Sequence, residues 1–169
     1  MLASSQSTTL RRFHAKDLDP FLAYRDDPEI ARFQSWEAMS REKAAGFIAH
    51  MASIDPLLRP GHWTQIAIAQ TATDDLIGDM GLYLSNDGLE AEIGITLARS
   101  SHGQGHAMRA CQLAVGLLFD RTAITRINAF ADARNTASRR LCDRLGFTFV
   151  GSETTDGVEE AVFISHRPE

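Results

Sequence analysis

Residues 91–120 change from strand periodicity to helical periodicity at a pair of glycines. The first part alternates apolar with polar or small residues, as a half-buried strand does, and the last part repeats apolar residues at helical spacing. These apolar residues are Ile93, Ile95 and Leu97 in the expected strand, and Ala107, Cys111, Ala114, Val115 and Leu118 in the expected helix. The period changes at Gly103 and Gly105, which let the chain turn tightly and let an anion approach the backbone amides. Because the start of a helix presents free N–H groups, this stretch predicts either an anion site or a turn that binds nothing.

Length and charge restrict the class of protein. A chain of 169 residues fits one domain, and we expect a single domain over residues 1–169 with a loose N-terminus at residues 1–8. The net charge of −5 argues against a nucleic-acid binder. Cys111 and Cys142 fall in expected helices, so we interpret them as buried thiols. Without a long apolar stretch or a signal-peptide pattern at the start, the sequence favours a cytoplasmic protein that does not bind a membrane.

The rest of the chain alternates short strands with helices. The expected strands are 9–13, 63–69, 76–84, 91–98, 126–131, 147–150 and 158–165, and the expected helices are 18–24, 28–33, 41–51, 107–120 and 136–145. Turn residues separate several of them, including Asn86-Asp87-Gly88 and Thr155-Asp156-Gly157. This order predicts an α/β fold with one mixed, mostly antiparallel sheet of seven strands and helices on both faces.

Three motifs together resemble one known family. They are Glu92-Ile93-Gly94-Ile95, the loop His102-Gly103-Gln104-Gly105-His106-Ala107, and Asn135-Thr136-Ala137-Ser138 followed by Leu145-Gly146-Phe147. With the order of elements, they are similar to the GCN5-related N-acetyltransferase (GNAT) family. The chain looks most like its RimJ/RimL type, the ribosomal-protein N-terminal acetyltransferases, over residues 10–165. Ser100 stands where the family's loop usually has glutamine or arginine.

The resemblance implies a GNAT fold in which strands 91–98 and 126–131 run parallel and splay apart around acetyl-CoA. Backbone groups of Ile95 and Leu97 would bind the pantetheine arm, since splayed strands leave peptide groups that need partners. The pyrophosphate would lie on the N–H groups of Gly103, Gln104, Gly105, His106 and Ala107. The implied reaction is direct attack of a primary amine on the thioester, with no metal. The amine belongs to a protein N-terminus or to a small molecule, and the resemblance makes a homodimer plausible.

Asn135 and Ser138 are the first candidates for a chemical role. They are three residues apart at a helix start, so they share one face. By the resemblance, Asn135 bonds the pantetheine arm, and the Ser138 hydroxyl donates to the sulfur. A tyrosine serves there in many relatives, but none occurs between Asn135 and Phe147. The alternative is that Asn135 is only a helix cap and Ser138 an ordinary residue of the first turn.

Glu92 is the candidate general base, either directly or by orienting a water molecule. It stands at the start of the strand that would present the thioester. It has two other interpretations: binding a cationic amine, or lying on an exposed strand face. Asp79, Asp132 and Glu90 are weaker candidates for the same role.

Other residues have weaker interpretations. Phe33, Trp36 and Tyr83 either line the acceptor pocket or belong to the core. The spacing of His102, His106 and Cys111 permits metal ligands, but no carboxylate pattern supports a metal. A non-catalytic acyl-CoA sensor is an alternative function. A nucleotide-binding protein is disfavoured, because neither a complete Gly-x-Gly-x-x-Gly motif nor a Walker motif is present.

Overall fold

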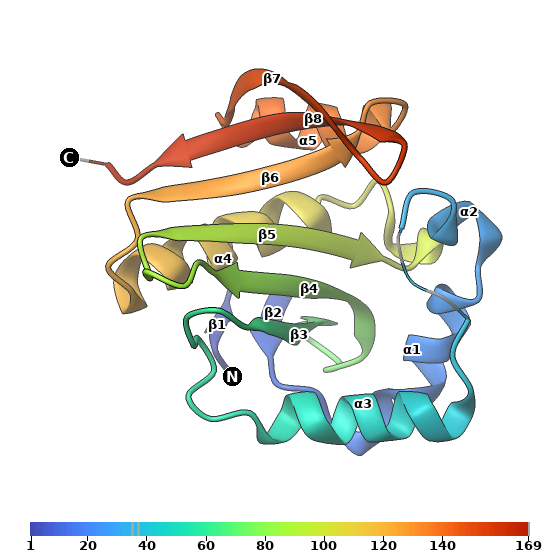
Figure 1. Ribbon diagram of the computed structural model, residues 1–169. Coiled ribbons are helices and arrows are strands. Elements are labelled where there is room, and N and C mark those ends of the chain that lie inside the picture. Colours follow the sequence, from blue (N-terminus) through green and yellow to red (C-terminus); the bar gives the residue numbers. More distant parts are fainter. Residues whose placement is uncertain (35, 37, 169) are drawn as a thin grey trace.

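The strands form a single sheet in the computed structural model, which describes residues 1–34, 36 and 38–168 (Figure 1). Across the sheet the order is β1-β2-β3-β4-β5-β6-β8-β7, and among these described strands only the β5–β6 pair is parallel. The strands are β1 (Ala3–Ser4), β2 (Thr8–Arg11), β3 (Trp63–Gln70), β4 (Leu76–Leu84), β5 (Glu90–Leu97), β6 (Arg126–Asp132), β7 (Thr148–Thr155) and β8 (Val158–His166). The expected mixed, mostly antiparallel sheet is confirmed.

The sheet has eight strands rather than the expected seven. The additional strand, β1, pairs with β2 through Ala3 opposite Leu10 and Ser4 opposite Thr9. It lies in the segment that we expected to be loose. A strand of two residues is too short to show alternation in the sequence, which is why periodicity missed it.

Helices cover both faces of the sheet (Figure 1). They are α1 (Leu18–Arg25), α2 (Pro28–Ala31), α3 (Arg41–Ser53), α4 (His106–Arg121) and α5 (Thr136–Arg144), with short 3-10 helices at Ala15–Asp17 and Arg99–Ser101. Figure 1 shows α4 and α5 behind the sheet, and α1 and α3 below it. Among the described residues, no helix combines the length and the apolar character that a membrane crossing requires.

Two apolar clusters hold these layers together. The cluster on the α4 and α5 side includes Met80, Ile93 and Leu118, all buried. The cluster on the α1 and α3 side includes Phe21 and Ile48, and the rings of Phe13, Tyr24 and Phe47 lie stacked or edge-on around Phe21. Burying one such side chain stabilises the fold by about 1.5–3 kcal/mol, so the two clusters fix the helices on their faces.

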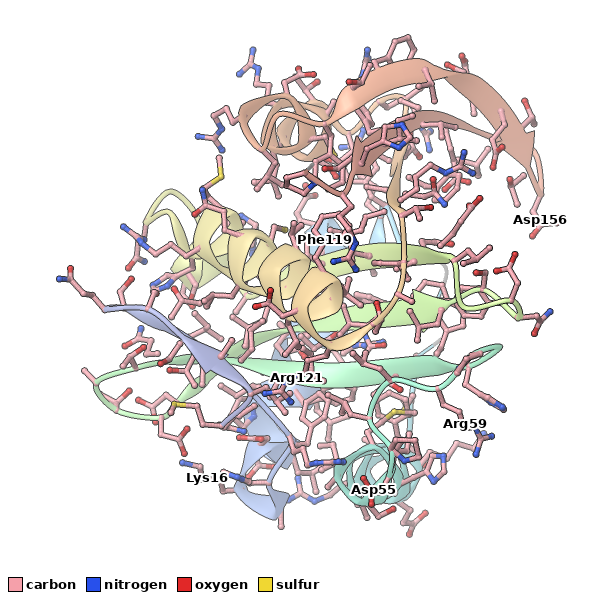
Figure 2. All side chains as sticks on the ribbon, turned by 90° about the vertical axis from the view of Figure 1, so that its left-hand side faces the viewer. Lys16, Asp55, Arg59, Phe119, Arg121 and Asp156 are labelled. Carbon is pink, nitrogen blue, oxygen red and sulfur yellow. The ribbon has the colours of Figure 1, made fainter. Side chains whose placement is uncertain are left out.

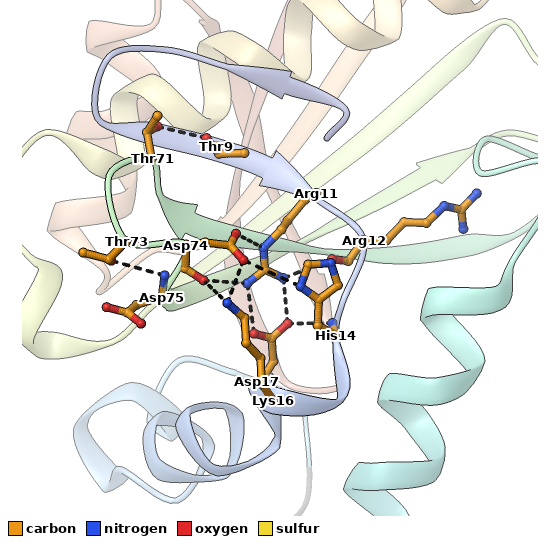
Figure 3. A network of polar contacts seen from close by, with 10 residues as sticks. All are labelled: Thr9, Arg11, Arg12, His14, Lys16, Asp17, Thr71, Thr73, Asp74 and Asp75. Carbon is orange, nitrogen blue, oxygen red and sulfur yellow. Dashed lines mark hydrogen bonds and ion pairs between the residues drawn. The ribbon is translucent and has the colours of Figure 1, made fainter.

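A buried ion pair joins the start of the chain to the β3–β4 turn (Figure 3). The Arg11 guanidinium donates two hydrogen bonds to the Asp17 carboxylate, at 2.7 and 2.9 Å. Arg11 Nε also donates to Asp74 at 2.6 Å, and Lys16 donates to the same carboxylate at 2.7 Å. These donors lower the pKa of Asp74 to about 2. The network therefore positions the segment that leads into α1.

The two parallel strands separate within the sheet. The ladder between β5 and β6 contains only Glu90 opposite Arg126, Ala91 opposite Ile127, and Glu92 opposite Asn128. Both strands then continue, β5 to Leu97 beside β4 and β6 to Asp132 beside β8. This is the splay that the family resemblance implied.

Candidate functional site

The edge of β5 that faces β6 presents peptide groups without a strand partner. The Thr125 N–H donates to the Leu89 carbonyl on the β6 side, and the Ser85 N–H donates to the Glu90 carbonyl on the β4 side. Because successive peptide groups of a strand alternate in direction, those of Ile93, Ile95 and Leu97 point toward β6. The Ile93 carbonyl and the peptide groups of Ile95 and Leu97 lie beyond the β5–β6 ladder, so two of the predicted cofactor contacts, Ile95 and Leu97, share the splayed edge.

The Leu97 carbonyl already has one partner. His102 Nε2 lies 3.0 Å from this oxygen, which makes His102 the donor. The imidazole therefore holds the loop of residues 102–107 against the end of β5. The Leu97 N–H and the second lone pair of its carbonyl are what remain for a ligand.

The start of α4 has no side-chain cap. Gly105 is the N-cap residue, with φ of +80°, and Gly103 before it has φ of +73°. The first N–H groups of the helix, from His106 onward, are those that an α-helix leaves without intrahelical partners. An uncapped helix start with two positive-φ glycines leaves its amides available, so the anion site stays a prediction.

The side chains of this loop turn back onto the protein. His106 is buried, and its Nδ1 is hydrogen-bonded to Thr8 Oγ1 at 2.8 Å. Burial and the nearby Arg109 lower the pKa of His106, which favours the neutral ring. Gln104 Nε2 donates to the Ser100 carbonyl at 2.8 Å. The predicted contribution of His106 and Gln104 can therefore come only from their backbone N–H groups.

Arg109 contacts this loop, and the sequence reasoning did not consider it. It lies one turn inside α4, and its Nη1 donates to the Gln104 carbonyl at 2.9 Å. A Cβ atom on Gly105 would lie 2.7 Å from the same nitrogen. The guanidinium thus packs over the glycine and brings a positive charge to the helix start. The signal was an arginine four residues after the second glycine.

The first turn of α5 carries Asn135 and Ser138. Asn135 is the N-cap residue, and its Oδ1 accepts a hydrogen bond from the Ser138 N–H at 3.1 Å. The capping interpretation of Asn135 is therefore correct. Its amide nitrogen and the Ser138 hydroxyl are both on partly exposed residues, so the structure leaves the functional roles as predictions.

Glu92 differs from the other three carboxylates considered as a base. Glu90 accepts hydrogen bonds from Arg126 and Asn128, which lower its pKa. Asp132 is held by Arg134, which lowers its pKa to about 2. No hydrogen bond or ion pair joins the Glu92 side chain to another described residue. Burial raises the pKa of Glu92 to about 7, and the negative charges of Glu160 and Glu153 add to the shift.

Asp79, the remaining alternative, has a structural role. Its carboxyl group is fully buried and accepts hydrogen bonds from the Tyr24 hydroxyl, from Gln65 Nε2, and from Arg25 at 3.1 Å. This cluster ties the end of α1 to β4. With three donors on its oxygens and no exposure, this carboxylate has no free surface toward a substrate.

Aromatic side chains lie beside Glu92 on the same face of the sheet. Tyr83 on β4 is the cross-strand neighbour of Glu92, and Trp63 on β3 is the neighbour of Tyr83. The two rings are 5.4 Å apart, and Trp63 is 47% exposed. The sequence reasoning proposed Tyr83 but missed Trp63, which only the strand register identifies.

The other two proposed aromatic residues lie elsewhere. The Arg25 guanidinium lies 3.9 Å from the centre of the Trp36 ring, and the Arg32 guanidinium lies 5.1 Å from that of Phe33. Trp36 also donates to the Arg25 carbonyl at 3.4 Å. These contacts place Trp36 beside the Asp79 cluster rather than beside Glu92.

The histidines and cysteine with metal-like spacing do not converge. His102 is bonded to Leu97 and His106 to Thr8, while burial raises the pKa of the Cys111 thiol to about 12. In the part of the chain that the structure describes, no three His, Cys, Asp or Glu side chains are grouped to hold a metal ion.

Comparisons with known proteins identify the family. Residues 8–148 match the family model described as Acetyltransferase (GNAT) domain. The chain is 28% identical over 144 residues to the uncharacterized N-acetyltransferase p20 of Bacillus licheniformis, covering 85% of this chain and 80% of that protein. It is 31% identical over 155 residues to the mycothiol acetyltransferase of Salinispora arenicola, covering 84% of this chain but only 45% of that protein.

A solved structure shows the same fold with a ligand. It is RimL, described as a ribosomal L7/L12 alpha-N-protein acetyltransferase in complex with coenzyme A. The TM-score is 0.80 at 17% identity, covering 96% of this chain and 95% of that chain. Because the family model spans most of the sequence, the chain belongs to the GNAT family and is an acetyltransferase.

Proposed function

We propose that this acetyltransferase takes its acetyl group from acetyl-CoA and transfers it to a primary amine that attacks the thioester directly. The observation that carries the proposal is Glu92, a carboxyl group without a partner in the described chain, whose pKa is about 7. It lies on β5 at the last residue paired with β6. A base whose pKa is near the working pH is the most effective acceptor of an amine proton. Glu92 therefore removes the proton that the amine must lose.

The backbone of the splay and the start of α4 would hold the acetyl-CoA. The peptide groups of Ile93, Ile95 and Leu97 pair with the pantetheine amides in the manner of an added strand. The N–H groups from Gly103 to Ala107 bind the pyrophosphate, and the positive end of the helix dipole favours its charge. Arg109 adds a cation beside Gly105. The uncapped helix start fits an anion of this kind because Gly105 carries no side chain to fill the space.

The Ser138 hydroxyl would donate a hydrogen bond to the sulfur of the leaving CoA. Acetyl-CoA supplies an already activated acetyl group, so the protein needs no covalent intermediate of its own. The Ser138 hydroxyl is free of the capping bond, which uses only its backbone N–H. It can donate a hydrogen bond to the thiolate as charge develops there. Asn135 holds the same turn through its Oδ1 and directs its amide N–H groups to the pantetheine arm.

The acceptor is the α-amine of a protein N-terminus in the form of the proposal we favour. An α-amine has a pKa near ~8, against ~10.4 for lysine, so a base of pKa about 7 can deprotonate it with little further help. The described acceptor of RimL, an N-terminal amine, supports this class. A small-molecule amine is the alternative, since the name of the mycothiol acetyltransferase indicates a small-molecule acceptor.

The test is release of the CoA thiol in the presence of a panel of acceptors. We expect turnover with peptides that carry a free N-terminus and none with the same peptides after N-terminal blocking. Turnover with small amines alone would keep the reaction and change the acceptor class. Absence of acetyl-CoA binding would contradict the proposal.

A variant distinguishes an enzyme from an acyl-CoA sensor. Ser138→Ala keeps the backbone N–H that Asn135 binds, so the fold and acetyl-CoA affinity should be retained. We expect kcat to fall by about 100-fold while the Kd of acetyl-CoA changes less than threefold. Unchanged turnover would remove Ser138 from the mechanism, and a biological role that survives without turnover would favour the sensor.

A further inference from the structure

Strand β7 forms one edge of the sheet, and its outer side has no partner among the described strands (Figure 1). It has eight residues, Thr148 to Thr155, and in the described chain it pairs with β8 alone. The opposite edge is β1, a strand of two residues. A very short strand offers few backbone groups to another chain, whereas β7 presents a row of free N–H and C=O groups. The edge at β7 is therefore open to a further strand.

Apolar side chains are exposed along this edge. Of the six large apolar side chains exposed among the described residues, three lie on β7 and β8. They are Phe149, Val150 and Val158, with exposed fractions of 50, 52 and 37%. The β7–β8 register shifts between Phe149 and Gly151, so β7 bends near its middle. Apolar side chains clustered along an open edge favour contact with another protein surface.

Positive charge lies at the start of β7. Helix α5 packs against β7, and its last residue, Arg144, is four positions before Thr148. Arg140 and Arg144 are both exposed, and with Ala137 and Asp143 they line a hollow of about 510 Å³. Neither arginine makes an ion pair or a side-chain hydrogen bond with another described residue. Two unpaired guanidinium groups thus stand beside a hollow with room for the side chains of a partner.

Negative charge lies at the other end of β7. Glu153 is near the end of the strand, Asp156 is at the tip of the hairpin, and Glu159 follows on β8 (Figure 2). All three are exposed, and none makes an ion pair or a side-chain hydrogen bond with another described residue. Residues 145–166 contain no lysine or arginine. At about 3.3 Å per residue the strand is about 23 Å long, so the two ends carry opposite charges that are well separated.

We propose that a second copy of this chain adds its own β7 to this edge in the antiparallel direction, which forms a twofold homodimer. A twofold axis near the middle of β7 places the start of each strand beside the end of the other. Arg140 and Arg144 of each copy then face Glu153, Asp156 and Glu159 of the other copy, so both junctions join opposite charges. Parallel pairing would bring like charges together, and an uncharged partner would leave both sets of charges unmatched.

The interface leaves the candidate site accessible. Strands β8 and β6 lie between β7 and the splay, so each copy keeps its own β5–β6 opening. The inference therefore does not rest on the function proposed above. Its test measures mass rather than turnover, which keeps a failure of one separate from a failure of the other.

The test measures the oligomeric state by sedimentation velocity. We expect the wild-type protein to reach twice the 18.6 kDa mass of the chain between about 1 and about 100 μM, the range of Kd typical of weak specific association. Over the same range, amide hydrogen exchange of residues 148–155 should slow, because the outer groups of β7 become hydrogen-bonded. Both measurements use the wild-type protein, so neither depends on the folding of a variant.

Two charge-reversal variants test which ends meet. Arg140→Glu/Arg144→Glu makes both ends of β7 negative, and Glu153→Arg/Glu159→Arg makes both positive on balance. Asp156 is left unchanged because it adopts a φ of +51° in the turn. Each variant alone should be monomeric, with the dimer Kd raised at least about 30-fold. An equimolar mixture of the two should form heterodimers, because each negative end then meets a positive one.

A matched control reverses the same two charges elsewhere. Arg59 and Arg121 are exposed and stand apart from the hairpin whose tip Asp156 marks (Figure 2). The Arg59→Glu/Arg121→Glu variant changes the net charge by the same amount as Arg140→Glu/Arg144→Glu. It should remain dimeric.

Four outcomes would overturn the inference. A wild-type protein that stays monomeric at the highest concentration has no such interface. Dimers that survive both charge reversals would place the contact on another surface, and dimers lost in the control would assign the effect to net charge. A mixture of the two charge-reversal variants that stays monomeric would show that the two ends of β7 do not meet.

Discussion

The two sides of β5 are built from different kinds of chemical group. On the edge toward β6 and at the start of α4, the available groups are backbone N–H and C=O, with glycines keeping side chains out of the way. On the face that carries Glu92, the available groups are side chains from β3, β4 and β5, beside Glu153 on β7 and Glu160 on β8. A backbone site recognises any ligand with the right amides and phosphates, so it suits a common acetyl donor. A side-chain site can change with each acceptor.

This difference predicts separable effects of mutation. Changes on the backbone side should weaken acetyl-CoA binding and leave the KM of the acceptor unchanged. Changes on the side-chain side should alter turnover or acceptor binding at constant affinity for acetyl-CoA. A variant that changes acetyl-CoA affinity and acceptor kinetics together would contradict this separation of the two sides.

The largest effect should come from Glu92→Gln on the side-chain side. Loss of a general base reduces rates by about 10²–10⁴-fold, and we expect kcat to fall by about 100-fold. In the wild type, kcat should rise with pH as Glu92 loses its proton, with a midpoint near its pKa of about 7. The variant should lose this inflection while the Kd of acetyl-CoA stays within threefold, as measured by pH-rate profiles and calorimetry.

Glu90→Gln is the matched control, because Glu90 is already paired with Arg126 and Asn128 and its pKa is lowered. It should keep the inflection. Stability gives an independent check on Glu92. Its pKa is raised in the folded state, so its ionisation costs stability as pH rises from about 4.5 to about 7. After allowance for partial exposure, Glu92→Gln should stabilise the protein by about 1 kcal/mol at pH 8 and by nothing at pH 4. A constant difference would contradict the raised pKa.

The next effect should come from Gly105→Ala on the backbone side. A Cβ atom there would lie 2.7 Å from Arg109 Nη1, and the residue would be held at φ of +80°. We expect the arginine to be displaced and the Kd of acetyl-CoA to rise about 30-fold, with acceptor KM unchanged. Gly88→Ala is the control, since it has φ of +71° but meets only Pro60 at 3.7 Å. Both should lose about 1 kcal/mol of stability, and an equal loss of acetyl-CoA affinity in both would attribute the effect to backbone strain.

The same division explains how much the sequence could predict. The cofactor side is largely local: a change of period, two glycines and a cap residue lie within short segments, and the helix starts were predicted from them. The splay was implied by the family resemblance rather than by these local signals. The choice among four carboxylates was not local. The sequence favoured Glu92 from its place at the start of the strand. The partners that commit Asp79 and Glu90, such as Tyr24 and Arg126, come from distant segments, so only the fold shows that these two alternatives are occupied.

Other features that the sequence did not predict also depend on contacts between distant segments or on local context. Trp63 reaches Glu92 through two cross-strand pairs, and no spacing along the chain encodes that register. Strand β1 has only two residues and gains its place by pairing with β2. Arg109 was hidden because an arginine one turn into a helix is also typical of a solvated face. Features encoded within a short sequence motif were predicted. Features that depend on contacts between distant segments were not.

A smaller effect should come from Trp63→Ala. The ring is 47% exposed and lies 5.4 Å from the Tyr83 ring, tilted against it, beside Glu92, so it is suited to contact the acceptor rather than to hold the fold. We expect acceptor KM to rise about tenfold, in line with a loss of about 1.4 kcal/mol, while the Kd of acetyl-CoA is unchanged. Phe149→Ala is the control: it removes a ring that is 50% exposed and lies tilted against Phe163 at 5.5 Å. If both variants raise KM equally, Trp63 is not an acceptor residue.

The smallest effect should come from Asn135→Asp, which separates the role of Asn135 as a helix cap from its proposed role as a hydrogen-bond donor to acetyl-CoA. Asn135→Asp keeps an oxygen that accepts from the Ser138 N–H, so the cap and the stability of α5 are retained. It removes the amide N–H groups assigned to the pantetheine arm, and we expect the Kd of acetyl-CoA to rise about fivefold, the cost of roughly 1 kcal/mol for one hydrogen bond. Asn135→Ala removes cap and donor together, so it should add a stability loss of about 1 kcal/mol. If the aspartate variant binds acetyl-CoA as well as the wild type does, Asn135 is a cap alone, and binding of the donor depends on the backbone of β5 and α4.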